Sequence, residues 1–139
     1  MGKFTTLSVD VATGDCDPSG YVQSPRTQSW LDSACRHFFE SCGVLPGRDG
    51  GPLPGIVDLS LLEQHARFVN RATYGERLTI TTRVREWRPD TFVQVHVVTR
   101  GEDLICESTE TRIFCVRDAQ DRRKIRAIPV PEDIRRRCE

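Results

Sequence analysis

Alternation of apolar and polar residues marks much of the second half of the chain. The clearest case is RLTITTRVREW at residues 77–87. One side carries Leu78, Ile80, Thr82 and Val84, and the other carries Thr79, Thr81, Arg83 and Arg85. A period of two is typical of a β-strand with one buried face. Comparable segments lie at 56–69, 92–100, 104–116 and 125–130. The pattern therefore predicts four or five antiparallel strands, with a hairpin turn at RPDT.

A longer period marks the segment from residue 24 to residue 42. Apolar side chains recur there at the three- and four-residue spacing of one helix face. They are Trp30, Leu31, Ala34, Cys35, Phe38, Phe39 and Cys42. Ser24 can cap this helix, Pro25 suits its first turn and Gly43 can end it. It is the longest helix that the sequence predicts, so its apolar face requires a large partner surface.

The order of the elements favours an α+β fold. A short strand at 5–12 and a loop at 13–23 precede the helix, and a turn-rich connector at 45–55 separates the helix from the strands. A short helix is expected at 131–138. A sheet that curls around one central helix would bury both apolar faces at once. The length of 139 residues suits one domain over 1–139.

Charge and cysteine spacing narrow the classes of function. Twenty basic and twenty acidic residues give a formal net charge of zero, which favours neither a nucleic acid nor a membrane as partner. No apolar run reaches the roughly 20 residues of a membrane span, and no secretory signal is expected. The six cysteines show no Cys-x-x-Cys spacing, and the histidines do not have the spacing of metal ligands. We therefore expect no metal and no cofactor. Free thiols fit a reducing, cytoplasmic setting best.

The segment GDCDPSG at 14–20 places two acids just before the long helix. Free N–H groups at the helix start can stabilise an oxyanion, while a loop carboxylate acts as nucleophile or base. A thioester needs only these two functions, because its thiolate leaves readily. We expect Asp15 to hold the loop, and the acids beside Cys16 disfavour its thiolate. Asp17 is the catalytic candidate, although an aspartate before proline is also a common turn residue.

GDCDPSGYV, followed by WLDSACRHFFESCG, closely resembles the 4-hydroxybenzoyl-CoA thioesterase family. The likeness continues in order through ARFVNRATYGERLTI, EWRPDTFVQ and RAIPVP, so it covers nearly the whole chain. It implies the hotdog fold, in which an antiparallel sheet wraps one long helix. It also implies hydrolysis of an acyl-CoA substrate, with an aromatic, hydroxybenzoyl-like acyl group favoured.

The resemblance assigns roles at matching positions. Asp17 matches the catalytic carboxylate, which attacks the thioester carbonyl or activates water, and the backbone N–H of Ser24 matches the oxyanion donor. Asp32 matches an aspartate near the far end of the acyl ring, while a plain polar residue on the helix surface is an equally good interpretation. The chain departs from the family pattern at Gln23, Ser24, Pro25, Arg26 and Thr27. This more polar pocket mouth leaves the identity of the acyl group open.

Other candidate substrate-binding residues lie further along the chain. In the hydroxybenzoyl enzyme, a basic hairpin turn helps hold the CoA phosphates. By resemblance, Arg88 is the one basic residue of that turn that this chain keeps. Arg126 lies in the matched RAIPVP stretch and is a second candidate cation. Glu63 and His65 share one face of a strand and could position water, although such residues more often serve packing or an interface.

The resemblance also implies assembly. We expect a homodimer with one continuous sheet, which removes an exposed edge, and pairing of dimers into a homotetramer with sites at the dimer interface. Two other functions stay open. One is a hotdog protein that binds an acyl thioester or an aromatic ligand without hydrolysing it, which the loss of charge at the hairpin turn favours. The other is an enoyl-thioester hydratase, for which Glu63 and His65 form the nearest acid–histidine pair.

Overall fold

The computed structural model describes residues 2–44 and 56–139. The strands are β1 (Phe4–Asp10), β2 (Ile56–Phe68), β3 (Arg77–Trp87), β4 (Phe92–Arg100), β5 (Asp103–Arg117) and β6 (Ile125–Ile128). The helices are α1 (Ser24–Ser41) and α2 (Glu132–Cys138), with a 3-10 turn, η1 (Thr13–Asp15), between β1 and α1. The predicted connector at 45–55 lies outside the described residues.

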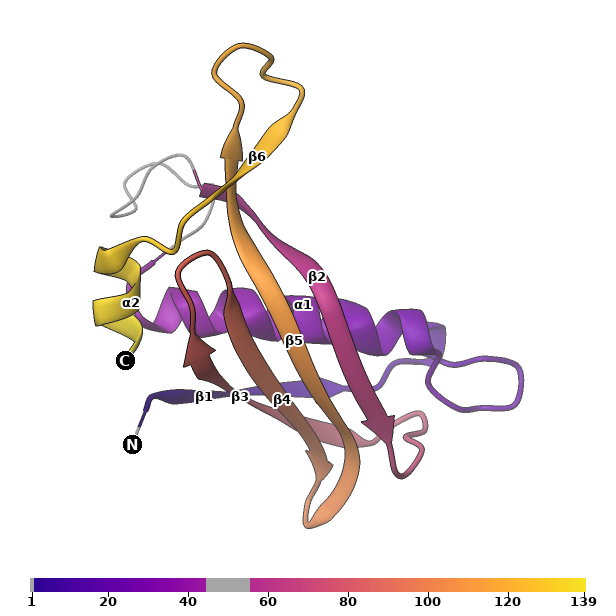
Figure 1. Cartoon of the computed structure of the whole chain (residues 1–139). Helices are drawn as coiled ribbons and strands as arrows, with labels where there is room; N and C mark the ends of the chain where they lie inside the picture. The colour runs from indigo at the N-terminus through magenta and orange to yellow at the C-terminus, as the bar shows by residue number, and fades with distance from the viewer. Residues whose placement is uncertain (1, 45–55) are drawn as a thin grey trace.

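The strands form one antiparallel sheet with α1 running across one face (Figure 1). The strand order is β1-β3-β4-β5-β2, and β6 pairs with β5. The loop that precedes α1 lies at one end of the helix, and α2 lies at the other end (Figure 1). A sheet wrapped around one long helix is the predicted α+β, hotdog arrangement.

Two apolar clusters hold α1 against the sheet. Toward the end of the helix, Phe39 packs edge-on against Phe92 and Phe114, with ring centroids 5.3 and 5.6 Å apart. Burial of each such side chain contributes about 1.5–3 kcal/mol. The second cluster joins the first half of the helix to the strands through Leu31, Ala34, Leu78, Ile80 and Val98. This second cluster lies beneath the loop that carries the predicted site.

The two best-defined strands begin and end at the predicted residues, 77–87 and 92–100. Leu78, Ile80 and Thr82 of β3 are buried, so the predicted alternation is confirmed. In the hairpin turn, the N–H of Arg88 donates to the carbonyl of Thr91 over 2.9 Å.

The helix start differs from the prediction by one residue. Gln23, not Ser24, is the N-cap, because the N–H groups of Arg26 and Thr27 both donate to the Gln23 carbonyl and close the first turn there. The prediction that Ser24 caps the helix is therefore wrong, and Ser24 is its first residue. Gly43 follows the C-cap with a φ of 81°, the left-handed conformation that ends helices at glycine.

The strand β2 lies at one edge of the sheet and is continuous. Register shifts occur between Ile56 and Asp58 and between Leu61 and Glu63, so the strand bends there without breaking. β2 pairs only with β5 among the described strands. Leu61 and Leu62 are 39% and 57% exposed. An apolar, unpaired edge of this kind is suited to pairing with another strand.

Candidate active site

The loop before α1 is a closed turn built around Asp17. The N–H of Asp17 donates to the carbonyl of Tyr21 over 2.8 Å, and the N–H of Gly20 donates back to the Asp17 carbonyl over 2.9 Å. Gly20 has a φ of 92°, which residues other than glycine rarely adopt. Cys16 and Val22 then form a β-bridge. The side chain of Asp17 thus projects from a defined backbone.

One oxygen of the Asp17 carboxylate is fully engaged and the other is free. Oδ1 accepts hydrogen bonds from the Ser19 N–H at 2.9 Å, the Ser19 hydroxyl at 2.6 Å and the Tyr21 N–H at 3.2 Å. These bonds, led by the one from the Ser19 side chain, hold the pKa of Asp17 below its ordinary value. Oδ2 accepts no hydrogen bond from any residue that the structure describes. Asp17 therefore presents an ionised, unpaired oxygen.

Asp15 holds the loop, as predicted. It is buried, and its Oδ2 accepts the N–H of Ala12 over 2.8 Å. Its Oδ1 lies 2.9 Å from Nε of Arg26, on the first turn of α1. Asp15 thus fixes the loop relative to the helix and has no oxygen left for chemistry.

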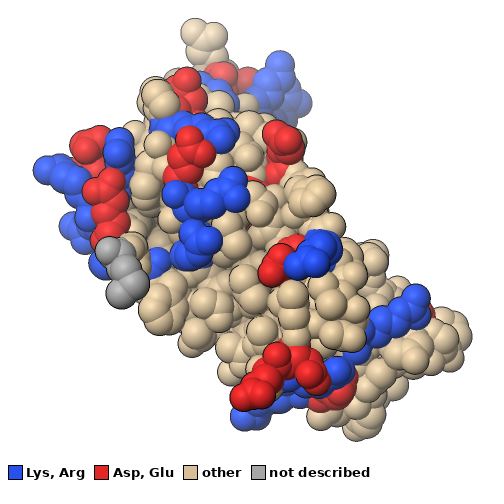
Figure 2. Space-filling model, turned by 60° about the horizontal axis from the view of Figure 1, so that its bottom comes forward, with Lys and Arg blue, Asp and Glu red and all other residues tan. Residues whose placement is uncertain are grey.

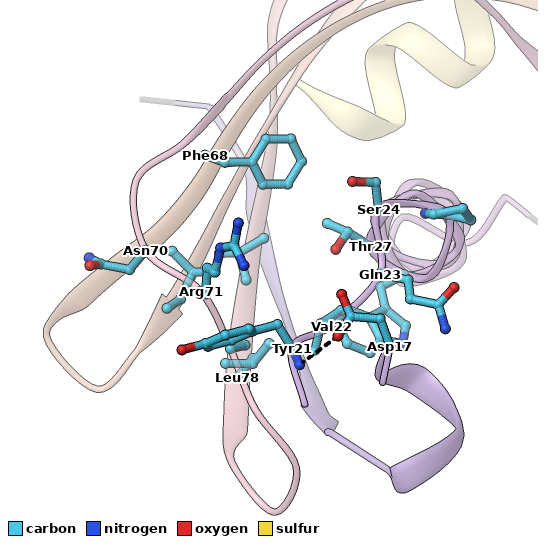
Figure 3. A pocket seen from close by; sticks show the side chains of 15 residues that line it. Asp17, Tyr21, Val22, Gln23, Ser24, Thr27, Phe68, Asn70, Arg71 and Leu78 are labelled. Carbon is cyan, nitrogen blue, oxygen red and sulfur yellow. Dashed lines mark hydrogen bonds between the residues drawn. The ribbon is translucent and has the colours of Figure 1, made fainter. Parts of the chain in front are cut away.

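Asp17 faces a cavity of about 530 Å³ at the start of α1 (Figure 3). The helix side of the wall is formed by Ser24, Pro25 and Thr27, and the sheet side includes Phe68 and Leu78. No acceptor among residues 2–44 and 56–139 takes the backbone N–H of Ser24. A free N–H at a helix start and a free carboxylate oxygen therefore border the same space, a combination suited to acyl transfer.

The segment between β2 and β3 supplies a wall that the sequence did not predict. Arg71 lies with its guanidinium carbon 4.8 Å from the centre of the Tyr21 ring, and both residues line the cavity (Figure 3). Tyr21 and Thr73 form a β-bridge that joins this segment to the Asp17 loop. The only sequence signal was the ARFVNRATYG motif itself, which carries no information about a partner some 50 residues earlier in the chain.

Asp32 lines a different cavity, of about 390 Å³, together with Arg112, Asp58 and Ser60. Its Oδ1 accepts Nη2 of Arg112 over 2.7 Å and Nε2 of Gln28 over 3.1 Å. Asp32 is therefore more than a plain surface residue, yet in a single chain it does not share the cavity of Asp17.

Behind Asp32 lies a polar network with a buried centre. His96, Glu110 and Arg112 are buried, Gln28 is half-buried and Gln64 is exposed. Nε2 of His96 lies 2.8 Å from Glu110 Oε1, which also accepts Nε of Arg112 over 3.0 Å. The two glutamines donate to Glu110 Oε2 over 3.2 and 3.0 Å. Burial alone would raise the pKa of Glu110, but the hydrogen bond and charge of His96 and the charge of Arg112 lower it to about 2. The network ties α1 to the middle of the sheet.

The remaining predicted residues lie on the surface, away from both cavities. Glu63 is exposed on the edge strand β2. Arg88 is exposed in the β3–β4 hairpin and pairs with Glu86 over 3.0 Å. Arg126 is exposed on β6. A single chain thus brings together Asp17 and Ser24, but not Asp32, Glu63, Arg88 or Arg126.

Surface charge gives no dominant field on the face shown in Figure 2, where acidic and basic side chains are interspersed among uncharged ones. None of the described helices is long and apolar enough to cross a membrane. Within the same described ranges, no three His, Cys, Asp or Glu residues gather in a way that could hold a metal ion.

Comparisons with known proteins agree with this geometry. The family model of the thioesterase-like superfamily matches residues 11–138. The curated 4-hydroxybenzoyl-CoA thioesterase of Pseudomonas sp. (strain CBS-3) is 38% identical over 143 residues, covering 99% of this chain and 99% of that protein. A solved structure of the D17N mutant of a 4-hydroxybenzoyl CoA thioesterase, complexed with 4-hydroxybenzoyl CoA, matches with a TM-score of 0.87 and 38% identity over 98% of this chain and 99% of that one.

A second solved structure, of a gentisyl-coenzyme A thioesterase, matches with a TM-score of 0.81 over 97% of this chain and 100% of that one. At 21% identity, this structural match shows a shared fold alone. The fold is the hotdog fold, with the Asp17 cavity at the start of its central helix. The chain belongs to the thioesterase-like superfamily. Within it, the predicted resemblance to the 4-hydroxybenzoyl-CoA thioesterases is confirmed.

Proposed function

We propose that this protein hydrolyses an acyl-CoA thioester, with an aromatic acyl group, to the free acid and CoA. The observation that carries the proposal is the free Oδ2 of Asp17, which shares a cavity with the unpaired N–H of Ser24 at the start of α1. The relative solved with 4-hydroxybenzoyl CoA is an Asp-to-Asn mutant, as expected if loss of a carboxylate preserves the bound thioester.

The proposed chemistry follows from these two groups. Asp17 Oδ2 adds to the thioester carbonyl carbon and expels the CoA thiolate, which leaves an acyl anhydride for water to cleave. Alternatively, it takes a proton from a water molecule that attacks the same carbon. In both routes negative charge develops on the carbonyl oxygen, which the N–H of Ser24 and the helix dipole stabilise.

A second copy of the chain completes the site in this proposal. The edge strand β2 and its exposed leucines support pairing of two sheets into a homodimer, with further pairing to a homotetramer. Asp32 lies eight residues into α1, about 12 Å from Ser24 along the helix axis. It can therefore contact the acyl ring at the Asp17 cavity only from another copy. Glu63, on the pairing strand, would lie at the same interface and position substrate or water.

The cations that hold CoA are proposed to be Arg88 and Arg126. Both are exposed and lie outside the two cavities, where the nucleotide end of CoA would extend. Because Glu86 partly neutralises Arg88, we assign Arg126 the larger part in binding the CoA phosphates. The six free thiols of the chain support a reducing compartment such as the cytoplasm.

The test is release of CoA thiol from a panel of aromatic and medium-chain acyl-CoA esters by the wild type, Asp17→Asn and Asp10→Asn. Asp10 is exposed and pairs with Arg77, so its variant controls for loss of an acid as such. We expect turnover of an aromatic ester that Asp17→Asn abolishes and Asp10→Asn preserves. Tight binding of the esters without turnover by the wild type would instead support a non-catalytic binding protein.

A further inference from the structure

A positive charge on the wall of the cavity, carried by the exposed residue Arg71, has no role in the chemistry described so far. Figure 3 shows the guanidinium of Arg71 on the wall opposite Ser24, over the face of Tyr21. No carboxylate among residues 2–44 and 56–139 forms an ion pair with it. The cavity therefore contains a cation that forms no direct ion pair with Asp17, and its charge adds to the hydrogen bonds that lower the pKa of Asp17.

The backbone of Arg71 is held in place. Its carbonyl accepts Nη1 of Arg100 over 3.1 Å, and Arg100 is itself paired with Glu76 at 3.0 Å. One residue earlier, Nδ2 of Asn70 donates to the carbonyl of Leu104 over 2.7 Å. The side chain then stacks on Tyr21, whose N–H donates to Asp17. Such anchoring lowers the cost of presenting the guanidinium to a ligand.

We propose that Arg71 is a specificity-determining residue that binds an anionic oxygen, best a carboxylate, on the acyl group of the substrate. This inference rests on the proposed function, since it assigns a substrate class to the same site. A guanidinium binds a carboxylate through two parallel N–H donors. Bound substrate would exclude water from this contact and so strengthen it. The aromatic and aliphatic walls, such as Phe68, Leu78 and Ile105, accommodate the rest of the acyl group.

The position of Arg71 argues against its other possible anionic ligands. It contacts Tyr21, the residue that donates to Asp17, so it lies close to the reacting carbon. The phosphates of CoA are separated from the thioester by the whole pantetheine arm and cannot reach this wall while the carbonyl is at Asp17. The acyl group is therefore the part of the substrate that can place an anionic oxygen there.

The experiment compares benzoyl-CoA esters that carry a carboxylate at ring position 3 or 4 with the matching methyl-substituted esters. Each ester is tested for hydrolysis by the wild type, Arg71→Met, Arg71→Lys and the control Arg135→Met. Arg135 is on α2, at the opposite end of the molecule, and pairs with Glu139. Binding of the same esters is measured calorimetrically with Asp17→Asn and with Asp17→Asn/Arg71→Met, which gives a readout independent of turnover.

We expect the wild type to prefer the carboxylated ester, at one ring position at least, by about ten- to a hundredfold in kcat/KM, as a charge-assisted hydrogen bond allows. Arg71→Met should abolish that preference, Arg71→Lys retain part of it and Arg135→Met leave it intact. Equal losses by Arg71→Met on both kinds of ester, or a wild-type preference for the methyl esters at both positions, would overturn the inference. If no ester is hydrolysed, the proposed function fails, and the binding preference alone decides the role of Arg71.

Discussion

Removal of one charge from the buried centre of the polar network should destabilise the protein severely. Glu110 and Arg112 are 0% and 5% exposed, and Arg112 bonds to Glu110, to the Leu59 carbonyl and to Asp32 at 3.0, 2.8 and 2.7 Å. Arg112→Met leaves the carboxylate of Glu110 buried without this counter-charge. Loss of one partner from a buried pair costs about 3–5 kcal/mol. For a chain of this length, the midpoint of thermal unfolding should fall on the order of 10–20 °C.

The assay is urea unfolding at pH 7 and at one fixed protein concentration, because assembly makes apparent stability depend on concentration. The matched variant is Glu110→Gln/Arg112→Met, which removes both charges. It should recover more than about 1 kcal/mol relative to Arg112→Met, because no unpaired carboxylate remains. The reasoning is refuted if Arg112→Met costs less than about 1 kcal/mol, or if the double variant is no more stable than the single one.

Two further predictions concern the same buried layer. The pKa of Glu110 is lowered from 4.5 to about 2, so the stability that Glu110 contributes is complete above pH 4.5 and is lost as the pH falls toward 2. The free energy of unfolding of the wild type should decrease over this window, and the decrease should be smaller in Glu110→Gln. Gln94 is fully buried, and neither of its amide atoms has a partner among the described residues. Gln94→Met should therefore stabilise the protein by about 1 kcal/mol in urea unfolding, and a loss of stability would contradict this account.

Local patterns predicted the strands and the helix well, because their signals lie within each segment. The bounds of β3 and β4 agree with the prediction, and Leu78 and Ile80 of β3 lie on the buried side. In β4 the buried side also contains the polar residues Gln94 and His96. The predicted N-cap, Ser24, is one residue later than the observed N-cap, Gln23. Both residues lie just before Pro25, and only the hydrogen bonds that close the first turn on the Gln23 carbonyl distinguish the two positions. Boundaries of this kind are the least reliable part of any sequence-based assignment.

The site was only partly predictable. Asp17 and Ser24 are close in sequence, so one motif sufficed to place both at the start of the helix. Arg71 reaches the same cavity through the bridge between Tyr21 and Thr73, a long-range pairing that no local pattern encodes. The buried charge at Glu110 was missed because acids on a strand usually face solvent. Its burial follows from β5 lying inside the sheet, with that face turned toward α1.

The most direct test of the central claim is the rate of CoA release from 4-hydroxybenzoyl-CoA, at saturating substrate, by the wild type, Asp17→Asn and the control Asp10→Asn. A carboxylate that acts as nucleophile or general base should be worth at least about a hundredfold in kcat. We therefore predict that Asp17→Asn loses at least that factor and still binds the thioester, while Asp10→Asn retains the wild-type rate. An Asp17→Asn variant that turns over at the wild-type rate would contradict the assignment of Asp17 as the catalytic carboxylate.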